Sequence, residues 1–220
     1  MQPTSVDNLL LQEPASNATS LERALAAARQ ELALKRPVRR WRTQAVWVFF
    51  SSVAVVGLVA AVLLIQEQMT WQTLLDRAPL FALLWSTSAV CAWSSLSPRG
   101  RWLRLVGGLM AMASAAALVL MRGSVAPVSS VPAWVCTLSH FAVGLGPLAV
   151  SVIALRACVF RPARALIAGL AVGTSGALLG ELACAQDWRH VAGYHLTAWA
   201  LIAVVEVVVS RFLKPRSFAP

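Results

Sequence analysis

The feature that most constrains this chain is a series of long apolar stretches that lack charged side chains. In the clearest of them, residues 46–65 read VWVFFSSVAVVGLVAAVLLI. A spanning helix needs about 20 mostly apolar residues to cross about 30 Å of hydrocarbon. Of the 220 residues, 58% are hydrophobic and 13% are charged, whereas a soluble domain has about a quarter charged residues. A protein core cannot bury so many such runs in so short a chain, so we predict a membrane protein.

Six stretches are apolar enough to span a membrane, and together they predict an all-α fold, a polytopic bundle of six transmembrane helices. The predicted spans are residues 44–65, 79–96, 105–121, 138–155, 165–185 and 195–210. We expect a cytoplasmic N-terminal segment at 1–43, a transmembrane domain at 44–212 and a short cytoplasmic tail at 213–220.

The basic residues are distributed unevenly between the two sides of these spans. Of the 19 Lys and Arg residues, all but Arg77, Arg122 and Arg189 fall in the N-terminal segment, after the last predicted span, or in the two loops on the same side. Because cytoplasmic loops keep the excess of Lys and Arg, we predict a bacterial inner-membrane protein with both termini in the cytoplasm. This asymmetry explains the net charge of +10, so we expect the lipid bilayer and a protein as partners, with no direct contact to nucleic acid.

The predicted loops are too short to hold a soluble catalytic domain. They contain no phosphate-binding glycine loop, zincin helix or nucleophile elbow, so we predict a protein that is not an enzyme and has no cofactor. Two carboxyl groups lie inside spans, Glu181 near the outer end of the fifth and Glu206 near the inner end of the sixth. Because charge is costly in hydrocarbon, we expect each to reach an interface or to pair with an arginine. The alternative is a proton or substrate pathway.

Four glycines follow one face of the fifth span. Gly169, Gly173, Gly176 and Gly180 are separated by four, three and four residues. Faces of small residues let a neighbouring backbone approach closely and are a common packing device in membranes. We interpret this stripe as packing within the bundle, with a dimer interface as the alternative.

Cysteine and histidine residues gather at the predicted outer ends of the spans. Cys136 precedes the fourth span and Cys184 ends the fifth, whereas Cys91 and Cys158 belong to the cytoplasmic half. Unpaired structural thiols, a disulfide allowed in an oxidising compartment and a Cys/His metal site all stay open for the outer pair. The spacing matches no standard zinc signature, so we assign no metal ligands. The candidate sensing or disulfide residues are Cys136, Cys184, His140 and His190, with Asp187 and His195 beside them.

The N-terminal segment contains a predicted amphipathic helix at residues 21–35, LERALAAARQELALK. Strong helix formers occupy it throughout, and its apolar stripe recurs at intervals of four, three and four. A stripe of leucine and alanine without large aromatic side chains is a weak membrane anchor, which favours docking into an apolar groove of a partner. The predicted partner-binding residues are Leu21, Leu25, Ala28 and Leu32 on the stripe, with Arg36, Arg39 and Arg40 toward acidic partner surface or lipid headgroups.

Several stretches resemble the membrane-bound anti-sigma factors of the NrsF type. One is LALKRPVRRWR at residues 32–42, before the first span. A second is Trp134-x-Cys136 followed by GLGPL at 144–148, and a third is RPARALIAGLAVGTSGALLGELAC at 161–184. The likeness covers most of the chain and includes the six spans with a short basic N-terminal segment.

This resemblance implies a binding protein without catalysis. Its cytoplasmic N-terminal segment would bind an extracytoplasmic-function sigma factor and hold it at the membrane, away from core RNA polymerase, until a signal releases it. The alternative is a small transporter or a redox or metal-binding membrane protein that uses the outer Cys/His residues. That alternative would make the N-terminal helix dispensable.

Overall fold

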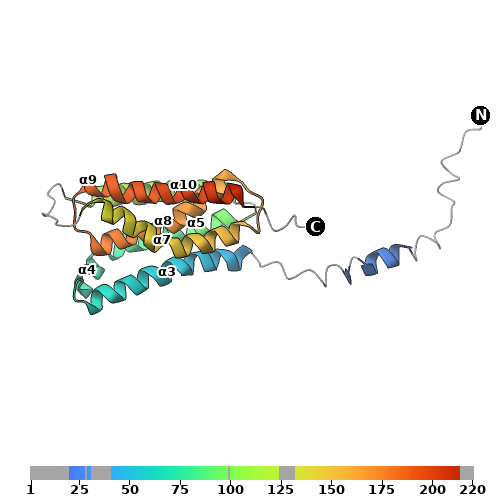
Figure 1. The fold of residues 1–220 in the computed structure, drawn as a ribbon, viewed down its shortest axis with the longest axis horizontal. Coiled ribbons are helices and arrows are strands. Elements are labelled where there is room, and N and C mark those ends of the chain that lie inside the picture. The colour runs from blue at the N-terminus through green and yellow to red at the C-terminus, as the bar shows by residue number, and fades with distance from the viewer. Residues whose placement is uncertain (1–19, 28, 31–40, 99, 124–131, 214–220) are drawn as a thin grey trace, which may run out of the picture. The chain divides into compact units, whose positions relative to one another are not determined.

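The computed structural model describes residues 20–27, 29–30, 41–98, 100–123 and 132–213. The chain forms two compact units, Met1–Arg39 and Arg40–Pro220. In the first unit the described residues, 20–27 and 29–30, are helical, and they begin one residue before the helix predicted at 21–35. In the second unit long helices run alongside one another and are joined by short connections, as Figure 1 shows.

Among the described residues, six helices are long and apolar enough to cross a membrane. They are α3 (Trp41–Ile65), α5 (Ala78–Leu96), α6 (Arg101–Leu120), α7 (Trp134–Leu155), α8 (Pro162–Ala183) and a final span, Trp188–Phe212. The final span consists of α9 (Trp188–His190), a π-helical turn η1 (Val191–Leu196) and α10 (Thr197–Phe212). The prediction of an all-α, six-span membrane protein is confirmed.

Several helices begin three or four residues before the predicted spans, and the structure differs most from the sequence prediction at two places. A short helix, α4 (Trp71–Asp76), follows α3, and the Thr70 hydroxyl caps it by accepting a hydrogen bond from the amide of Thr73 at 3.2 Å. The final span begins at Trp188 instead of residue 195. Here the carboxylate of Asp187 accepts a hydrogen bond from the amide of His190 at 3.0 Å. Such an N-cap satisfies a free amide at a helix start, so residues that we expected in a loop become helical.

Helix α8 lies at the centre of the bundle. It packs against α3, α5, α7 and α10, and 78% of its membrane segment is buried, against 17% for α3. A β-carbon on Gly169 would lie 2.5 Å from the Cα atom of Ala203 on α10. Because only glycine permits an approach this close, the interpretation of the glycine stripe as packing within the bundle is confirmed.

The two carboxyl groups inside the spans have different surroundings. Glu181 on α8 forms ion pairs with Arg77 and Arg122, the latter at 2.6 Å, as the cost of a charge in hydrocarbon predicts. Glu206 on α10 is fully buried, and it accepts a hydrogen bond from the hydroxyl of Ser151 at 3.0 Å.

Among the described residues Glu206 has no ion pair. The prediction that it reaches an interface or pairs with an arginine is therefore wrong. The physical reason is the rotation of α10, which turns this side chain toward Ser151 on α7 and Gly169 on α8. A burial of this kind follows from helix packing, which no single span reveals.

Candidate functional site

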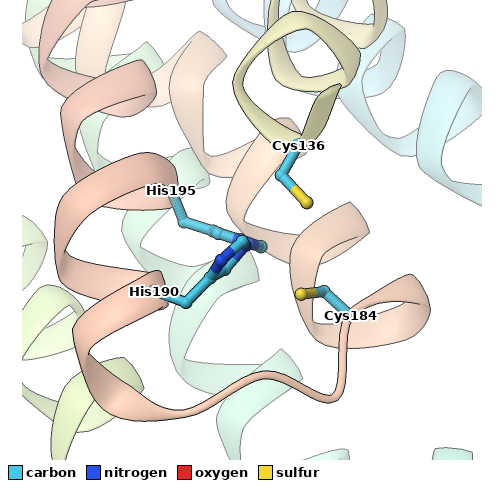
Figure 2. Close-up of side chains that lie close together, drawn as sticks. All are labelled: Cys136, Cys184, His190 and His195. Carbon is cyan, nitrogen blue, oxygen red and sulfur yellow. The ribbon is translucent and has the colours of Figure 1, made fainter. Parts of the chain in front are cut away.

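A cluster of thiol and imidazole side chains lies at one end of the bundle, which we call the cluster end. Its members are Cys136 on α7, Cys184 directly after α8, His190 on α9 and His195 on η1. One ligand atom from each side chain, a sulfur or a ring nitrogen, lies within 4.8 Å of the others. Figure 2 shows the two imidazoles approaching the two sulfur atoms from the final span. Side chains from three different spans thus converge on one small volume.

A π-helical turn aligns the two histidines of the cluster. His190 and His195 are five residues apart, so in a regular α-helix of 3.6 residues per turn they would point about 140° apart. A π-helix closes its turn with hydrogen bonds between residues five apart, which places such residues nearly above one another. The turn Val191–Leu196 therefore brings both rings to one side, with their centroids 5.2 Å apart. Turns of this kind are frequent at functional sites.

Two glycines of α8 leave room for imidazole rings at the cluster end. A β-carbon on Gly176 would lie 2.5 Å from Cδ2 of His140, and one on Gly180 would lie 2.5 Å from Cε1 of His195. A side chain at either position would displace a ring, because the helix backbone cannot move away from its buried neighbours without cost. The glycine stripe thus packs helices together along its length and positions histidines at this end.

His140 on α7 supports the cluster from the side. Its Nδ1 donates a hydrogen bond to the carbonyl oxygen of Cys136 at 2.8 Å. Its ring packs edge-on against His195, with the two centroids 4.7 Å apart. In the neutral imidazole, the hydrogen bond from Nδ1 leaves Nε2 as the ring nitrogen without a proton. The ring of His140 therefore holds both the backbone of one cluster residue and the side chain of another.

The cluster borders a cavity of ≈ 500 Å³. The four cluster residues and His140 all line it. The Nε2 atoms of His140, His190 and His195 are buried and have no hydrogen-bond partner within the part of the chain that the structure describes. Buried polar atoms in proteins normally have a partner. Three such nitrogens beside two thiols therefore form a set of donor atoms available to a ligand.

A network of ion pairs around the buried carboxylate of Glu181 holds the segment that carries Cys184. Arg122 pairs with Glu181, and its Nη1 donates a hydrogen bond to the carbonyl oxygen of Cys184 at 2.7 Å. Arg77 pairs with the other carboxylate oxygen of Glu181. Two of the three arginines that the charge distribution assigns to this side are thus bound to one carboxylate. One of them, Arg122, also holds the backbone of a cluster cysteine.

The structure brings together the residues that the sequence indicated as candidates for sensing or for a disulfide. Cys136, Cys184, His140 and His190 all lie at the cavity, and His195, which we placed beside the site, lies in the cluster itself. His195 could have been predicted only from its spacing of five residues from His190. That spacing places the two side chains on one face only where the helix contains a π-helical turn. The cysteines are free, so the disulfide alternative is not formed in this structure.

The other two cysteines lie toward the opposite end of the bundle, which we call the basic end. Cys91 on α5 is fully buried, and its thiol donates a hydrogen bond to the carbonyl oxygen of Gly107 at 3.3 Å. Cys158 lies between α7 and α8, where burial raises the pKa of its thiol and the charge of Arg164 lowers it. Both behave as small packed side chains.

The predicted partner-binding stripe is described only in part. Leu21 and Leu25 lie on the N-terminal helix with exposed fractions of 61% and 47%. The remaining predicted contacts lie outside the described residues: Ala28, Leu32, Arg36, Arg39 and Arg40.

The fold and the cluster define a polytopic, all-α membrane protein with thiols and imidazoles gathered at one end. Over 218 residues the chain is 58% identical to the carotenogenesis protein CarR of Myxococcus xanthus, an alignment that covers 99% of each chain. The chain therefore belongs to the CarR family of carotenogenesis proteins. No family model matches it, and no solved structure does.

Proposed function

We propose that this chain is a membrane-anchored anti-sigma factor in the control of carotenoid biosynthesis. In this role its N-terminal segment holds an extracytoplasmic-function sigma factor at the inner membrane, and a signal, light-derived in carotenoid control, releases it. The observation that carries the proposal is the identity of 58% to CarR over 99% of both chains. An identity this high over the full length supports a shared regulatory role.

The N-terminal helix suits the docking step of this mechanism. Leu21 and Leu25 are one helical turn apart and exposed, so they present one apolar face. Burying a leucine side chain contributes about 1.5–3 kcal/mol, and amphipathic helices commonly place such a face in a groove of a partner. In the proposed mechanism the chain competes with RNA polymerase for the sigma factor, and burial of these two leucines would contribute to its affinity for that partner.

The arginines of the cluster end support the proposed orientation. Arg77 and Arg122 both pair with Glu181, and the guanidinium of Arg189 lies over the ring of Trp188 at 5.4 Å. The few cations on this side are thus compensated or packed. The excess of Lys and Arg belongs to the other side, as expected of a cytoplasmic face, which is where a sigma factor is available.

The proposal is tested by capturing the tagged full-length protein from detergent-solubilised membranes of uninduced cells. The variant Leu21→Asp/Leu25→Asp places two charges on the apolar stripe. We expect about 100-fold weaker retention of the sigma factor, because more than 2.7 kcal/mol of apolar burial is lost, at about 1.4 kcal/mol per factor of ten.

The matched control is Ala26→Asp/Gln30→Asp, which adds two charges to the same helix off the stripe. Its retention of the sigma factor should equal that of the unmodified chain. Equal retention by the stripe variant would contradict the docking face, and absence of any sigma factor from the full-length chain would contradict the proposed function.

A further inference from the structure

We propose that Cys136, Cys184, His190 and His195 form a tetrahedral binding site for one divalent, thiophilic metal ion of the zinc class. The inference rests on the cluster end alone and is independent of the proposed anti-sigma role. It assigns to these four side chains a ligand that accounts for their convergence from three spans.

The geometry of the cluster is close to that of a zinc site. With Zn–S bonds of about 2.3 Å and Zn–N bonds of about 2.0–2.1 Å, the ligand atoms of a tetrahedral centre lie about 3.4–3.8 Å apart. The four ligand atoms here lie within 4.8 Å of one another. Closing the set around an ion thus requires side-chain movements of about 1 Å or less, which rotation about the side-chain bonds supplies.

The four ligand side chains determine which kind of metal ion fits the site. Two thiols and two imidazoles suit zinc and other thiophilic ions, whereas calcium and magnesium prefer oxygen ligands. The thiols lose their protons when they bind metal. Two thiolates then cancel the charge of a divalent ion, so the bound site is neutral, which suits an end of a membrane bundle where net charge is costly. A monovalent ion would leave one negative charge.

The surroundings hold the site in a shape ready for binding. The Nε2 atoms of His190 and His195 are buried without a hydrogen-bond partner among the described residues, so coordination displaces no existing bond of theirs. The backbone carbonyls of both cysteines are held, that of Cys136 by His140 at 2.8 Å and that of Cys184 by Arg122 at 2.7 Å. These contacts fix the backbone from which each cysteine side chain extends.

A disulfide between Cys136 and Cys184 is the competing use of the same sulfur atoms. It would join the two thiols but leave the two imidazole nitrogens of the final span buried and unpartnered. It would also give no role to the π-helical turn that brings His190 and His195 together. The metal site accounts for all of these features at once.

The experiment is a metal titration of the full-length protein, purified in mild detergent, reduced and stripped with a chelator. Cobalt(II) is the probe, because tetrahedral thiolate coordination gives intense visible bands and a sulfur-to-cobalt charge-transfer band. We expect one cobalt per chain, displaced stoichiometrically by zinc. Cys184→Ser and His195→Gln each remove a proposed ligand, so each should weaken cobalt binding by more than the roughly tenfold that loss of an outer-shell partner costs. The serine variant should also lose charge-transfer intensity.

Cys158→Ser is the matched control, since Cys158 lies outside the cluster between α7 and α8, and it should bind cobalt as the unmodified chain does. The proposal is overturned if the unmodified chain shows no thiolate–cobalt spectrum, which depends on no variant folding correctly. It is overturned equally if folded Cys136→Ser and Cys184→Ser chains keep the full spectrum, or if mass spectrometry of protein from unreduced membranes finds only the Cys136–Cys184 disulfide.

Discussion

The two ends of the bundle provide hydrogen-bond acceptors for their arginines in different ways. At the cluster end, Arg77 and Arg122 share the carboxylate of Glu181. At the basic end, Arg164 is only 9% exposed. It donates hydrogen bonds to the backbone carbonyl oxygens of Ser97 and Pro98, both at 3.2 Å. One end thus uses an acidic side chain, and the other uses the carbonyls that follow α5.

The charge distribution explains the difference. The basic end has many arginines and few acids, so a buried guanidinium there must find another acceptor. The last carbonyl groups of a helix have no partner inside the helix and carry partial negative charge, and Arg104 also donates to the carbonyl of Ser94 at 3.3 Å. The cluster end has few arginines, and one glutamate binds two of them. The arginine charges at the cluster end are thus largely compensated by this carboxylate, which permits a neutral Cys/His site beside them.

The largest expected effect comes from removing the carboxylate of the cluster end. Glu181→Gln leaves Arg122, whose side chain is 5% exposed, without its ionic partner. Breaking a buried pair from one side costs about 3–5 kcal/mol, so we expect a large drop in the free energy of unfolding in detergent, measured by thermal or denaturant unfolding.

Glu206→Gln is the matched control on α10, because it removes a buried carboxyl group that has no ion pair among the described residues. The amide oxygen of glutamine can still accept the hydrogen bond from Ser151. The change in unfolding free energy should stay below about 1 kcal/mol. Equal loss of unfolding free energy in the two variants would show that the ion pairs of Glu181 contribute no more to stability than the hydrogen bond of Glu206.

A smaller effect is expected from filling the space beside the cluster. In Gly180→Ala the new methyl group would overlap the imidazole ring of His195, whose Cε1 atom would lie 2.5 Å from it. Overpacking of this kind costs about 1–3 kcal/mol, and the displaced ring should also weaken cobalt binding. Gly57→Ala is the control, since nothing lies within 4 Å of a β-carbon there. If Gly180→Ala unfolds and binds cobalt like Gly57→Ala, the glycine has no positioning role.

The smallest of these effects is expected at the basic end. Arg164→Gln removes the guanidinium hydrogen bonds to the carbonyl oxygens after α5 but leaves no carboxylate unpaired. Hydrogen bonds from a charged group contribute about 1.5–3 kcal/mol, and the glutamine amide recovers part of that, so a net loss near 1 kcal/mol should appear in denaturant unfolding. A loss as large as that of Glu181→Gln would show that both ends depend equally on their arginines.

Much of the fold was predictable from local sequence, whereas the site was predictable only in its parts. The uncharged run at 46–65 and the prolines that open α5 and α8 indicate helices without any knowledge of neighbours. The cysteines and histidines of the cluster end could be assigned to one side of the membrane by counting along the spans. Their contact with one another could not be predicted. The surface of a helix that faces lipid and the surface that faces another helix are both apolar, so hydropathy does not show how each helix is rotated in the bundle.

The sequence by itself determined that this chain is a six-span helical membrane protein, because lipid satisfies no backbone hydrogen bonds and admits only such helices for apolar runs of this length. Only the tertiary structure decided which polar side chains meet. It turned Glu206 inward to Ser151, joined Glu181 to Arg122, and aligned His195 with His190. These outcomes depend on close packing around the glycine face of α8 and on one π-helical turn, both of which are properties of neighbouring helices rather than of any single segment.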